Sequence, residues 1–473
     1  MKGTPSVTDM RNLVVGVDET VELLDGTRHP YINFDNASST PFLRPVLETL
    51  NSFATLYASV GRGSGYKSHV STEAFDAARA TIGRFVGASL ETHAVILGKN
   101  TTEALNKLAH CLELGEKDVV LTSLMEHHSN DLPWRRAAAV HHIGLKEDGS
   151  LDVDHLRDLL KRHAGKVRLV TITGASNVTG FINPIHEIAE TVHEAGAMFG
   201  VDAAQLAPHR TIDVGMPSDP RRIDFLAYTG HKMYAPLGIG ALVALREAVS
   251  ASEPDLVGGG TVDLVTEEDV VWSSLPAREE AGTQNVVGAV AWAQAIDTLS
   301  QIGMDRVAEH EAKLTEVMLP ALQAIDGVQI FGDSDPARAR SRLGVTTFRI
   351  KGIDHKKAAA ILGYEGGIGV RAGMFCAHPY VQRLLGLTSE QSKTLVRDMR
   401  SQKRTSAPGL IRASFGIYNV DAEIERFVQA VNLIVSGRYE GEYVLDPASG
   451  AYKPLGAAGW GTRNAPWSPR DCT

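Results

Sequence analysis

The sequence predicts an α/β protein built on a mainly parallel sheet. Short apolar runs bounded by glycine or polar residues alternate with segments of helical period, as when 167–174 precedes 184–195. Strands that alternate with helices form β-α-β units, whose strands lie parallel in one sheet. The chain has 473 residues, of which 43% are hydrophobic, so it is long enough for two domains with a sizeable core.

The first segments of the chain predict short strands before the first long helices. The pieces 13–17 and 19–24 are strand-like, and the second ends at a turn signal. A strand that starts at Tyr31 runs into a polar turn, and a helix is predicted from about Leu43. The segment 71–86 has apolar residues at helical spacing and predicts an amphipathic helix.

Largely apolar runs in the middle of the chain predict the strands of the central sheet: 95–97, 118–123, 167–174, 198–201 and 223–228. They are too short for helices, and polar residues follow them. In α/β sheets, ligands bind beyond the carboxyl ends of the strands. We therefore expect the polar residues after these strands to converge on one crevice.

The last third of the chain predicts a smaller domain. A long helix is predicted over 286–302, and strands follow at 328–331 and 344–350. The charged stretch 386–408 predicts a helix that is either solvated or forms a lid or partner surface. The tail, 439–473, has no helical or strand period, which predicts an extended arm or a partly disordered segment.

Composition narrows the classes of function. The 47 Lys and Arg residues against 56 Asp and Glu give a net charge of −9, and no basic block indicates nucleic acid or a membrane surface. No apolar segment resembles a membrane span or a signal peptide. The 3 cysteines are far apart, so neither disulfides nor a zinc site is expected. No residues have the spacing of metal ligands, and a cytoplasmic location is predicted.

The residues after two neighbouring strands suit one cofactor, pyridoxal phosphate (PLP). The Lys232 amine can condense with an aldehyde, and Asp202 can keep a pyridine nitrogen protonated. The Gln205 amide can donate to a phenolate oxygen, while Thr229 and His231 can hold a phosphate. Considered alone, Asp202 and Lys232 also fit a structural ion pair. A second phosphate contact is predicted at Thr101 and Thr102, where a helix begins; N-capping by a threonine is the simpler reading there.

The order of these motifs resembles a known family. Asp-Ala-Ala-Gln at 202–205 followed by Thr-Gly-His-Lys at 229–232 resembles the class V aminotransferase family of PLP enzymes, and most of all the SufS-like (group II) cysteine desulfurases and selenocysteine lyases. The resemblance runs from about Tyr31 to about Val435. It implies PLP fold type I: a large domain, 31–297, with a seven-stranded, mainly parallel sheet flanked by helices, and a smaller α+β C-terminal domain, 1–30 with 298–438.

The resemblance also assigns roles to residues around the cofactor. In the family's Glu-His-His motif the first histidine stacks on the cofactor and can move protons, which is His127 here. The asparagine of Ser-Asn-Val-X-Gly lies near the phenolate and the substrate, which implies this role for Asn177 over that of a turn residue. The threonine of the family's Arg-Phe-Glu-Ala-Gly-Thr binds the phosphate in the other subunit. Thr283 therefore implies a homodimer with shared sites.

The remaining implied residues bind the substrate. Ala37 and Ser38 border the pocket, and the arginine of the family's Arg-Ala-Ser strand, Arg412, grips the substrate carboxylate. The family's Val-Arg-Thr-Gly-X-X-Cys-Ala motif matches Arg371 and Cys376, and its cysteine is the sulfur acceptor. Buried free cysteine is the alternative for Cys376. A thiolate there needs positive neighbours, for which His127, His378 or Arg371 are candidates.

Among the departures from the family's motifs, Gly61 replaces a histidine, Asn100 a glycine, Glu279 a phenylalanine and Gln284 a proline. The resulting hypothesis is a PLP enzyme that removes sulfur from L-cysteine, or selenium from selenocysteine, giving alanine and a Cys376 persulfide. A protein or small molecule would accept the sulfur. The alternatives are another class V reaction, by a C–S lyase, epimerase or aminotransferase, and a scaffold of this fold without turnover.

Overall fold

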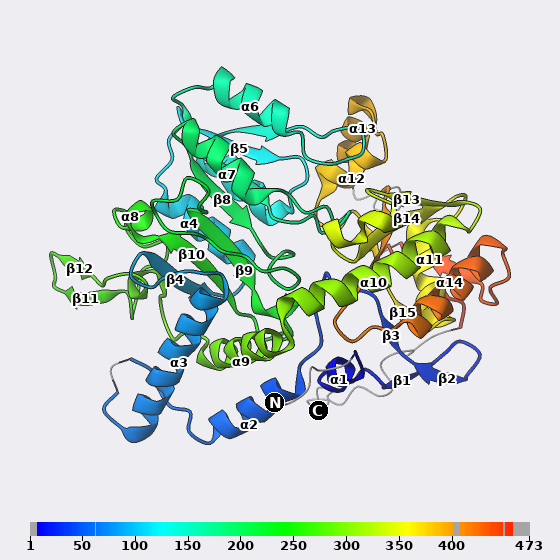
Figure 1. The fold of residues 1–473 in the computed structure, drawn as a ribbon, viewed down its shortest axis with the longest axis horizontal. Helices are drawn as coiled ribbons and strands as arrows, with labels where there is room; N and C mark the ends of the chain where they lie inside the picture. The colour runs from blue at the N-terminus through cyan, green and yellow to red at the C-terminus, as the bar shows by residue number, and fades with distance from the viewer. Residues whose placement is uncertain (1–6, 62, 402–406, 448–449, 457–473) are drawn as a thin grey trace.

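The computed structural model describes residues 7–61, 63–401, 407–447 and 450–456. Its larger lobe is built on a seven-stranded sheet in which β10 runs antiparallel to both of its neighbours and the other neighbouring strands are parallel. The predicted mainly parallel sheet is confirmed (Figure 1). In sheet order the strands are β4 (His93–Gly98), β10 (Gly240–Leu245), β9 (Phe225–Thr229), β8 (Met198–Asp202), β7 (Val167–Thr173), β5 (Val119–Ser123) and β6 (Ala139–Ile143).

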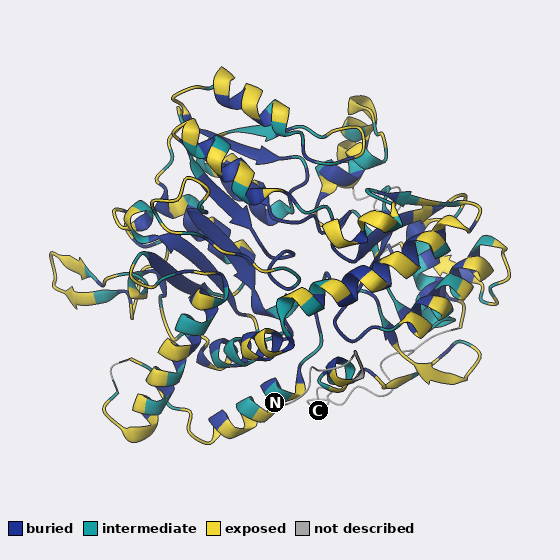
Figure 2. Cartoon of the chain, viewed as in Figure 1, coloured by how far each residue is buried: buried dark blue, intermediate teal, exposed yellow. Residues whose placement is uncertain are grey.

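Helices cover both faces of this sheet because its strands are apolar on both sides. In β4, Val95 and Leu97 belong to one core and Ala94 and Ile96 to the other, as the alternation of strand side chains requires. The strands are accordingly buried between layers of helices (Figure 2). The first core includes residues of α2 (Arg44–Ala54), α3 (Tyr66–Phe85), α6 (Val153–Arg162), α7 (Ile185–Glu194) and α9 (Val286–Ile302), and the second includes residues of α4 (Thr101–Cys111), α5 (Leu132–Ala137) and α8 (Arg246–Val249).

The smaller lobe has its own sheet and its own core. The sheet is antiparallel, and Phe34 and Phe427 meet edge to face, with ring centroids 5.5 Å apart. This lobe has the predicted α+β character, while the predicted domain boundaries stay a prediction. Its elements are β13 (Val328–Phe331), β14 (Val345–Ile350), β17 (Leu410–Ser414) and β16 (Arg371–Gly373), with α10 (Met304–Gln323), η4 (Pro336–Ser341), α11 (His355–Tyr364) and α14 (Asp421–Val435).

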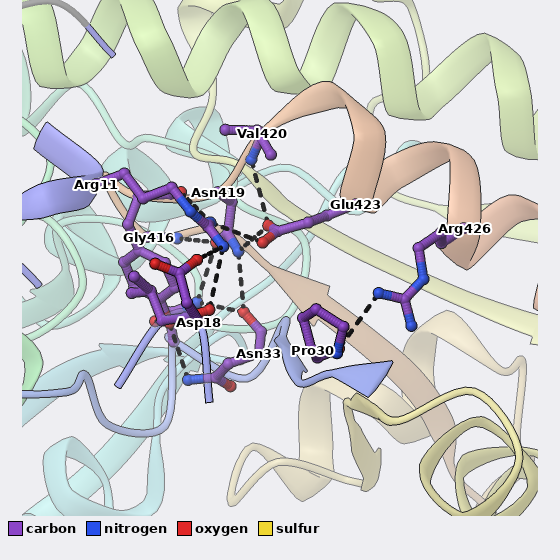
Figure 3. Close-up of polar contacts among 12 residues, drawn as sticks. Arg11, Asp18, Pro30, Asn33, Gly416, Asn419, Val420, Glu423 and Arg426 are labelled. Atoms are coloured by element: carbon purple, nitrogen blue, oxygen red, sulfur yellow. Dashed lines mark hydrogen bonds and ion pairs between the residues drawn. The ribbon is translucent and has the colours of Figure 1, made fainter. Parts of the chain in front are cut away.

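The N-terminal segment packs on the smaller lobe. Arg11 donates to Glu423 of α14 over 2.8 Å (Figure 3). The strand predicted at 13–17 is wrong: Val14 forms only an isolated bridge to Leu43, and Gly16 turns the chain with a φ of +77°. The segment contains α1 (Val7–Asn12), the hairpin β1 (Thr20–Glu22) and β2 (Arg28–Pro30), and β3 (Ile32–Asn33), which pairs with β15 (Ile368–Gly369).

The C-terminal elements complete the smaller lobe. The charged stretch 386–408 contains α13 (Ser389–Arg400), after α12 (His378–Leu384), while 402–406 lie outside the described residues. The tail was predicted to be an extended arm or a partly disordered segment, and its described part contains a hairpin in which β18 (Tyr443–Leu445) pairs with β19 (Tyr452–Pro454). The Tyr443 hydroxyl donates to Glu365 over 2.8 Å, which fixes this hairpin on the lobe. The rest of the tail, 457–473 with Cys472, is outside the described residues.

Within the described ranges, no helix is both long enough and apolar enough to cross a membrane.

One further hairpin, β11 (Val262–Val265) with β12 (Val270–Trp272), projects from the larger lobe on the side away from the smaller one (Figure 1).

Candidate active site

The ends of three parallel strands open into one cavity of about 370 Å³. Thr173, Asp202 and Thr229, the last residues of β7, β8 and β9, all line it, as expected for the carboxyl edge of such a sheet. The structure brings together every predicted site residue except Thr283: Ala37, Ser38, Thr101, Thr102, His127, Asn177, Asp202, Gln205, Thr229, His231, Lys232, Arg371, Cys376 and Arg412.

Lys232 and Asp202 line the same cavity and interact electrostatically. Lys232 ends the short helix η2 (Gly230–Lys232), directly after β9. Burial lowers the pKa of Lys232 to about 8, Asp202 opposes this shift, and Arg412 adds to it. Burial also raises the pKa of Asp202, against a 3.0 Å hydrogen bond from the Ala204 amide and the charge of Lys232. About a tenth of the amine is therefore uncharged at pH 7, far more than for an ordinary lysine, and is available as a nucleophile.

His127 lines the same cavity as a neutral imidazole. Burial, with Lys232 next in size, lowers its pKa to about 3. Its Nδ1 accepts from the Ser129 amide over 3.2 Å, and the Ser129 hydroxyl lies 2.9 Å from the same atom. That hydroxyl also lies 2.6 Å from the Thr102 hydroxyl, so the His127 ring is tied to the start of α4. The suggestion that His127 gives Cys376 a positive neighbour is wrong.

The start of α4 presents polar groups to the cavity. Asn100 caps the helix, its Oδ1 accepting from the Glu103 amide over 3.0 Å. The buried Thr101 hydroxyl has no hydrogen-bond partner among the described residues. A Cβ on Gly240 would lie 2.6 Å from the Asn100 Cα, so β10 supports this turn closely. Free amides at a helix start beside an unpaired hydroxyl are the donor set that a phosphate requires.

Two arginines from the smaller lobe close the other end of the cavity. Arg412 of β17 is buried, which lowers its pKa to about 10 even though Asp35 opposes the shift. It donates to Asp35 over 3.2 Å, to Ser38 over 2.8 Å and to the Asn177 carbonyl over 2.9 Å. Its Nε has no partner among the described residues. Arg371 is bound by the same pair: it donates to Ser38 over 3.0 Å and to Asp35 over 2.8 Å.

Cys376 lies exposed at the edge of the same cavity, so the alternative of a buried cysteine does not hold. Phe375 and Cys376 have φ values of +52° and +53°, in the left-handed region that side chains other than glycine rarely adopt. Lys232 and Arg412 are positive groups that line the same cavity and interact electrostatically with Cys376. Burial lowers the pKa of His378, so this histidine is not the predicted source of charge either.

Two predicted cofactor contacts, Gln205 and Thr229, are hydrogen-bonded within the fold, and a third, His231, carries a shifted pKa. The Gln205 amide donates to the Ala37 carbonyl over 2.7 Å and keeps one N–H for another partner. The Thr229 hydroxyl donates its only proton to the Ile239 carbonyl over 2.9 Å. Burial lowers the pKa of His231 to about 4, so it is neutral at pH 7. Their roles toward a cofactor stay predictions.

Thr283 does not line this cavity. It is exposed and precedes α9, and its predicted role in the site of a second subunit stays a prediction. Among the described residues, no group of three or more His, Cys, Asp and Glu side chains is placed to hold a metal ion.

Sequence reasoning missed two carboxyl groups that organise the site. One is Asp35, which bridges both arginines although it lies within the motif compared with the family. The other is Glu126, which accepts from the Asn130 side chain over 2.7 Å and from the Thr173 amide over 2.9 Å. Burial raises the pKa of Glu126 to about 8, outweighing these bonds, so at pH 7 it adds little negative charge near Asp202. Asp35 lies two positions before Ala37, and Glu126 is the first residue of the Glu-His-His motif, so these positions were the available signal.

Comparison with known proteins identifies the class. The family model "Aminotransferase class-V" matches residues 32–427. Together with the seven-stranded sheet and the lysine and aspartate at its edge, this match shows that the chain belongs to the class V aminotransferase family.

Relatives within this family are cysteine desulfurases by name. The chain is 32% identical over 417 residues to the cysteine desulfurase of Haloferax volcanii, covering 86% of this chain and 90% of that protein. It is 33% identical over 411 residues to a probable cysteine desulfurase of Halalkalibacterium halodurans, covering 85% and 92%.

Solved structures show the same fold. The apo cysteine desulfurase of Thermococcus onnurineus superposes with a TM-score of 0.76 at 31% identity, covering 86% of this chain and 95% of that one. The Escherichia coli cysteine desulfurase CsdA also superposes with a TM-score of 0.76, at 26% identity, covering 93% and 100%. The predicted fold type I is confirmed.

Proposed function

We propose that this protein is a PLP-dependent cysteine desulfurase that converts L-cysteine, or selenocysteine, to alanine and leaves the sulfur or selenium on Cys376. The observation that carries the proposal is the meeting of Lys232, Arg412 and an exposed Cys376 in one cavity. Its relatives are cysteine desulfurases by name, and their resemblance covers most of the chain.

The residues present fit PLP. Lys232 would hold it covalently, Asp202 would contact the ring nitrogen, His127 would face the ring, and the start of α4 with Thr101 would hold the phosphate. When bound, PLP supplies an electron sink for the substrate carbons. The unpaired Thr101 hydroxyl is the feature of this structure that the phosphate would satisfy.

Arg412 would orient the substrate. Its Asp35, Ser38 and Asn177 contacts hold the guanidinium still, and the buried Nε is free to donate to a carboxylate. Lys232 would accept the α-proton of the substrate and return a proton to carbon, and its pKa of about 8 suits both transfers.

Cys376 would take the sulfur. Its thiolate attacks the substrate sulfur, an S–S bond forms, and the C–S bond breaks with its electron pair remaining on carbon. A proton then completes alanine, and Cys376 is left as a persulfide. The sum is L-cysteine plus a thiol giving L-alanine plus a persulfide, which balances without another reactant. A protein or small-molecule thiol would later accept the sulfur.

The assembly and location form part of the same proposal. A homodimer is supported by the exposed position of Thr283, outside its own chain's cavity, since the family uses this residue in the partner's site. A cytoplasmic location is supported by the dispersed cysteines.

The test is to incubate the PLP-loaded protein with L-cysteine and identify the carbon product. We expect alanine in wild type and none in Cys376→Ala, with cysteine still binding. Pyruvate and sulfide that survive Cys376→Ala would instead establish a C–S lyase. Racemised cysteine would indicate an epimerase, and amino transfer to a keto acid an aminotransferase. A protein that binds no PLP would indicate a scaffold.

A further inference from the structure

The loop that carries Cys376 rests on the turn that carries His127. His127 caps the short helix η1 (His128–Asn130), and the first residue of this helix, His128, contacts the loop at two points that follow the Cys376 side chain. The His128 amide donates to the Cys376 carbonyl over 2.7 Å. The His128 Nε2 accepts from the His378 amide over 3.3 Å, and the rings of His128 and His378 meet edge to face at 4.4 Å.

The backbone that these contacts hold is strained. Two consecutive residues without the freedom of glycine, Phe375 and Cys376, have φ near +50°. Such conformations cost energy and persist only where surrounding contacts enforce them. The Asn177 amide secures the Phe375 carbonyl over 2.8 Å, and His128 secures the two positions that follow. Released from His128, the loop would relax and the Cys376 thiol would turn away from its present direction.

We propose that His128 is a positioning residue that holds the Cys376 thiol at the cavity through the His128 amide and Nε2. The inference rests on the proposed function and adds to it a residue that touches neither cofactor nor substrate. His128 is adjacent to His127, so one turn aligns the ring-facing imidazole and the nucleophile together.

The contact at Nε2 requires a neutral imidazole with its proton on Nδ1. Protonation would point an N–H at the His378 amide N–H and break the contact. The groups that face His128 are His127 and Asp131 of its own turn, Arg135 of α5 and His378 of α12. Burial and then His378 lower the pKa of His128, and Asp131 opposes them. The contact is therefore intact at neutral pH and is lost only below about pH 6.5, the ordinary value for histidine.

The experiment compares His128→Gln with His128→Leu in the PLP-loaded protein. A glutamine oxygen can accept from the His378 amide and does not titrate, whereas leucine fills similar space without an acceptor. The matched control is His110→Leu, at the end of α4 away from the cavity. Three quantities are measured: turnover to alanine, the affinity for L-cysteine, and the rate at which iodoacetamide alkylates Cys376, followed on the Cys376 peptide.

We expect His128→Leu to lower kcat at pH 8 by about tenfold or more with cysteine affinity unchanged, because the thiol is misaligned but the substrate site is intact. Alkylation of Cys376 should slow by at least about threefold, because the relaxed loop turns the thiol away from its present exposed position. His128→Gln should keep both rates near wild type at pH 8. Below about pH 6.5 its turnover, relative to wild type, should rise as wild type loses the contact.

The inference is overturned if His128→Leu turns over cysteine like wild type, or if His128→Leu and His128→Gln lose turnover to the same extent. It is also overturned if the turnover of His128→Gln relative to wild type does not change with pH. Alkylation needs no substrate, so it separates the two proposals. If wild type forms no alanine, the proposed function fails, and a slower alkylation in Leu but not in Gln or His110→Leu still supports the positioning role.

Discussion

The buried ion pair between Lys107 and Glu279 gives a quantitative prediction. Glu279 ends the short helix η3 (Ala277–Glu279), where the family has phenylalanine, and Lys107 lies on α4. Their Nζ and Oε2 are 3.2 Å apart, and both side chains are almost fully buried. Asp255 adds a weaker contact, 3.7 Å from the Lys107 Nζ. The pair links the helix at the phosphate end of the cavity to the segment that leads to Thr283.

The expected magnitudes follow from what each substitution leaves behind. Lys107→Met leaves the Glu279 carboxylate buried with Arg278, 3.9 Å away, and the Asp255 amide, which donates over 3.4 Å, and should cost about 3–5 kcal/mol. Glu279→Gln leaves Lys107 with Asp255 as its partner, so its cost in stability should lie at the lower end of the same range. Lys107→Met with Glu279→Phe replaces the whole pair by apolar side chains, which is often neutral or stabilising. The double variant should therefore be more stable than Lys107→Met alone.

Hydrogen exchange of the α4 amides is the assay, because a chain with two lobes need not unfold in one step. A loss of about 3–5 kcal/mol makes exchange through the open state roughly 10²- to 5 × 10³-fold faster. Lys313→Met, which removes an exposed pair with Glu309, is the control and should change little. The reasoning would be refuted if exchange in Lys107→Met were less than about tenfold faster than in wild type. It would also be refuted if the double variant were no more stable than Lys107→Met.

Three further predictions concern the site and the acid stability of the fold. Arg412→Lys loses the forked guanidinium and should raise the KM for cysteine about 10–100-fold, measured by alanine formation. Capture of PLP by the cofactor-free protein needs the neutral Lys232 amine, so its rate should fall about tenfold per pH unit below pH 8 and vanish in Lys232→Arg. Burial raises the pKa of Glu311, but His209 and Arg210 outweigh it and hold the pKa at about 2. This stabilisation is present above about pH 4.5 and is lost as the pH falls toward 2. The thermal midpoint of Glu311→Gln should therefore change less with pH over that window than the midpoint of wild type does.

The central sheet was predictable because its signals are local. Each buried strand is a short apolar run, and the polar residues at the ends of β8 and β9 placed Asp202 and Lys232 at one edge. The helix α9 has the predicted bounds, since its apolar period is unbroken over 286–302. The site was predictable where strand ends and motifs coincide.

The parts that were wrong or missed depend on contacts between distant segments. Val14 pairs with Leu43 in a single bridge, which no period in 13–17 reveals. The strands of the tail hairpin have three residues each, too few to show alternation. The role of Asp35 requires two arginines from β16 and β17, which lie far along the chain and meet it only in the folded protein.

The contact between the N-terminal segment and α14 has a consequence for folding during synthesis. Arg11 and Glu423 are separated by 412 positions, and ribosomes add about 5–20 residues per second, so Arg11 waits roughly 20–80 s for its partner. The larger sheet, whose strands all lie between 93 and 245, is complete long before that. We therefore expect the larger lobe to fold on the ribosome first, while the leading segment of the nascent chain is docked last, when α14 emerges.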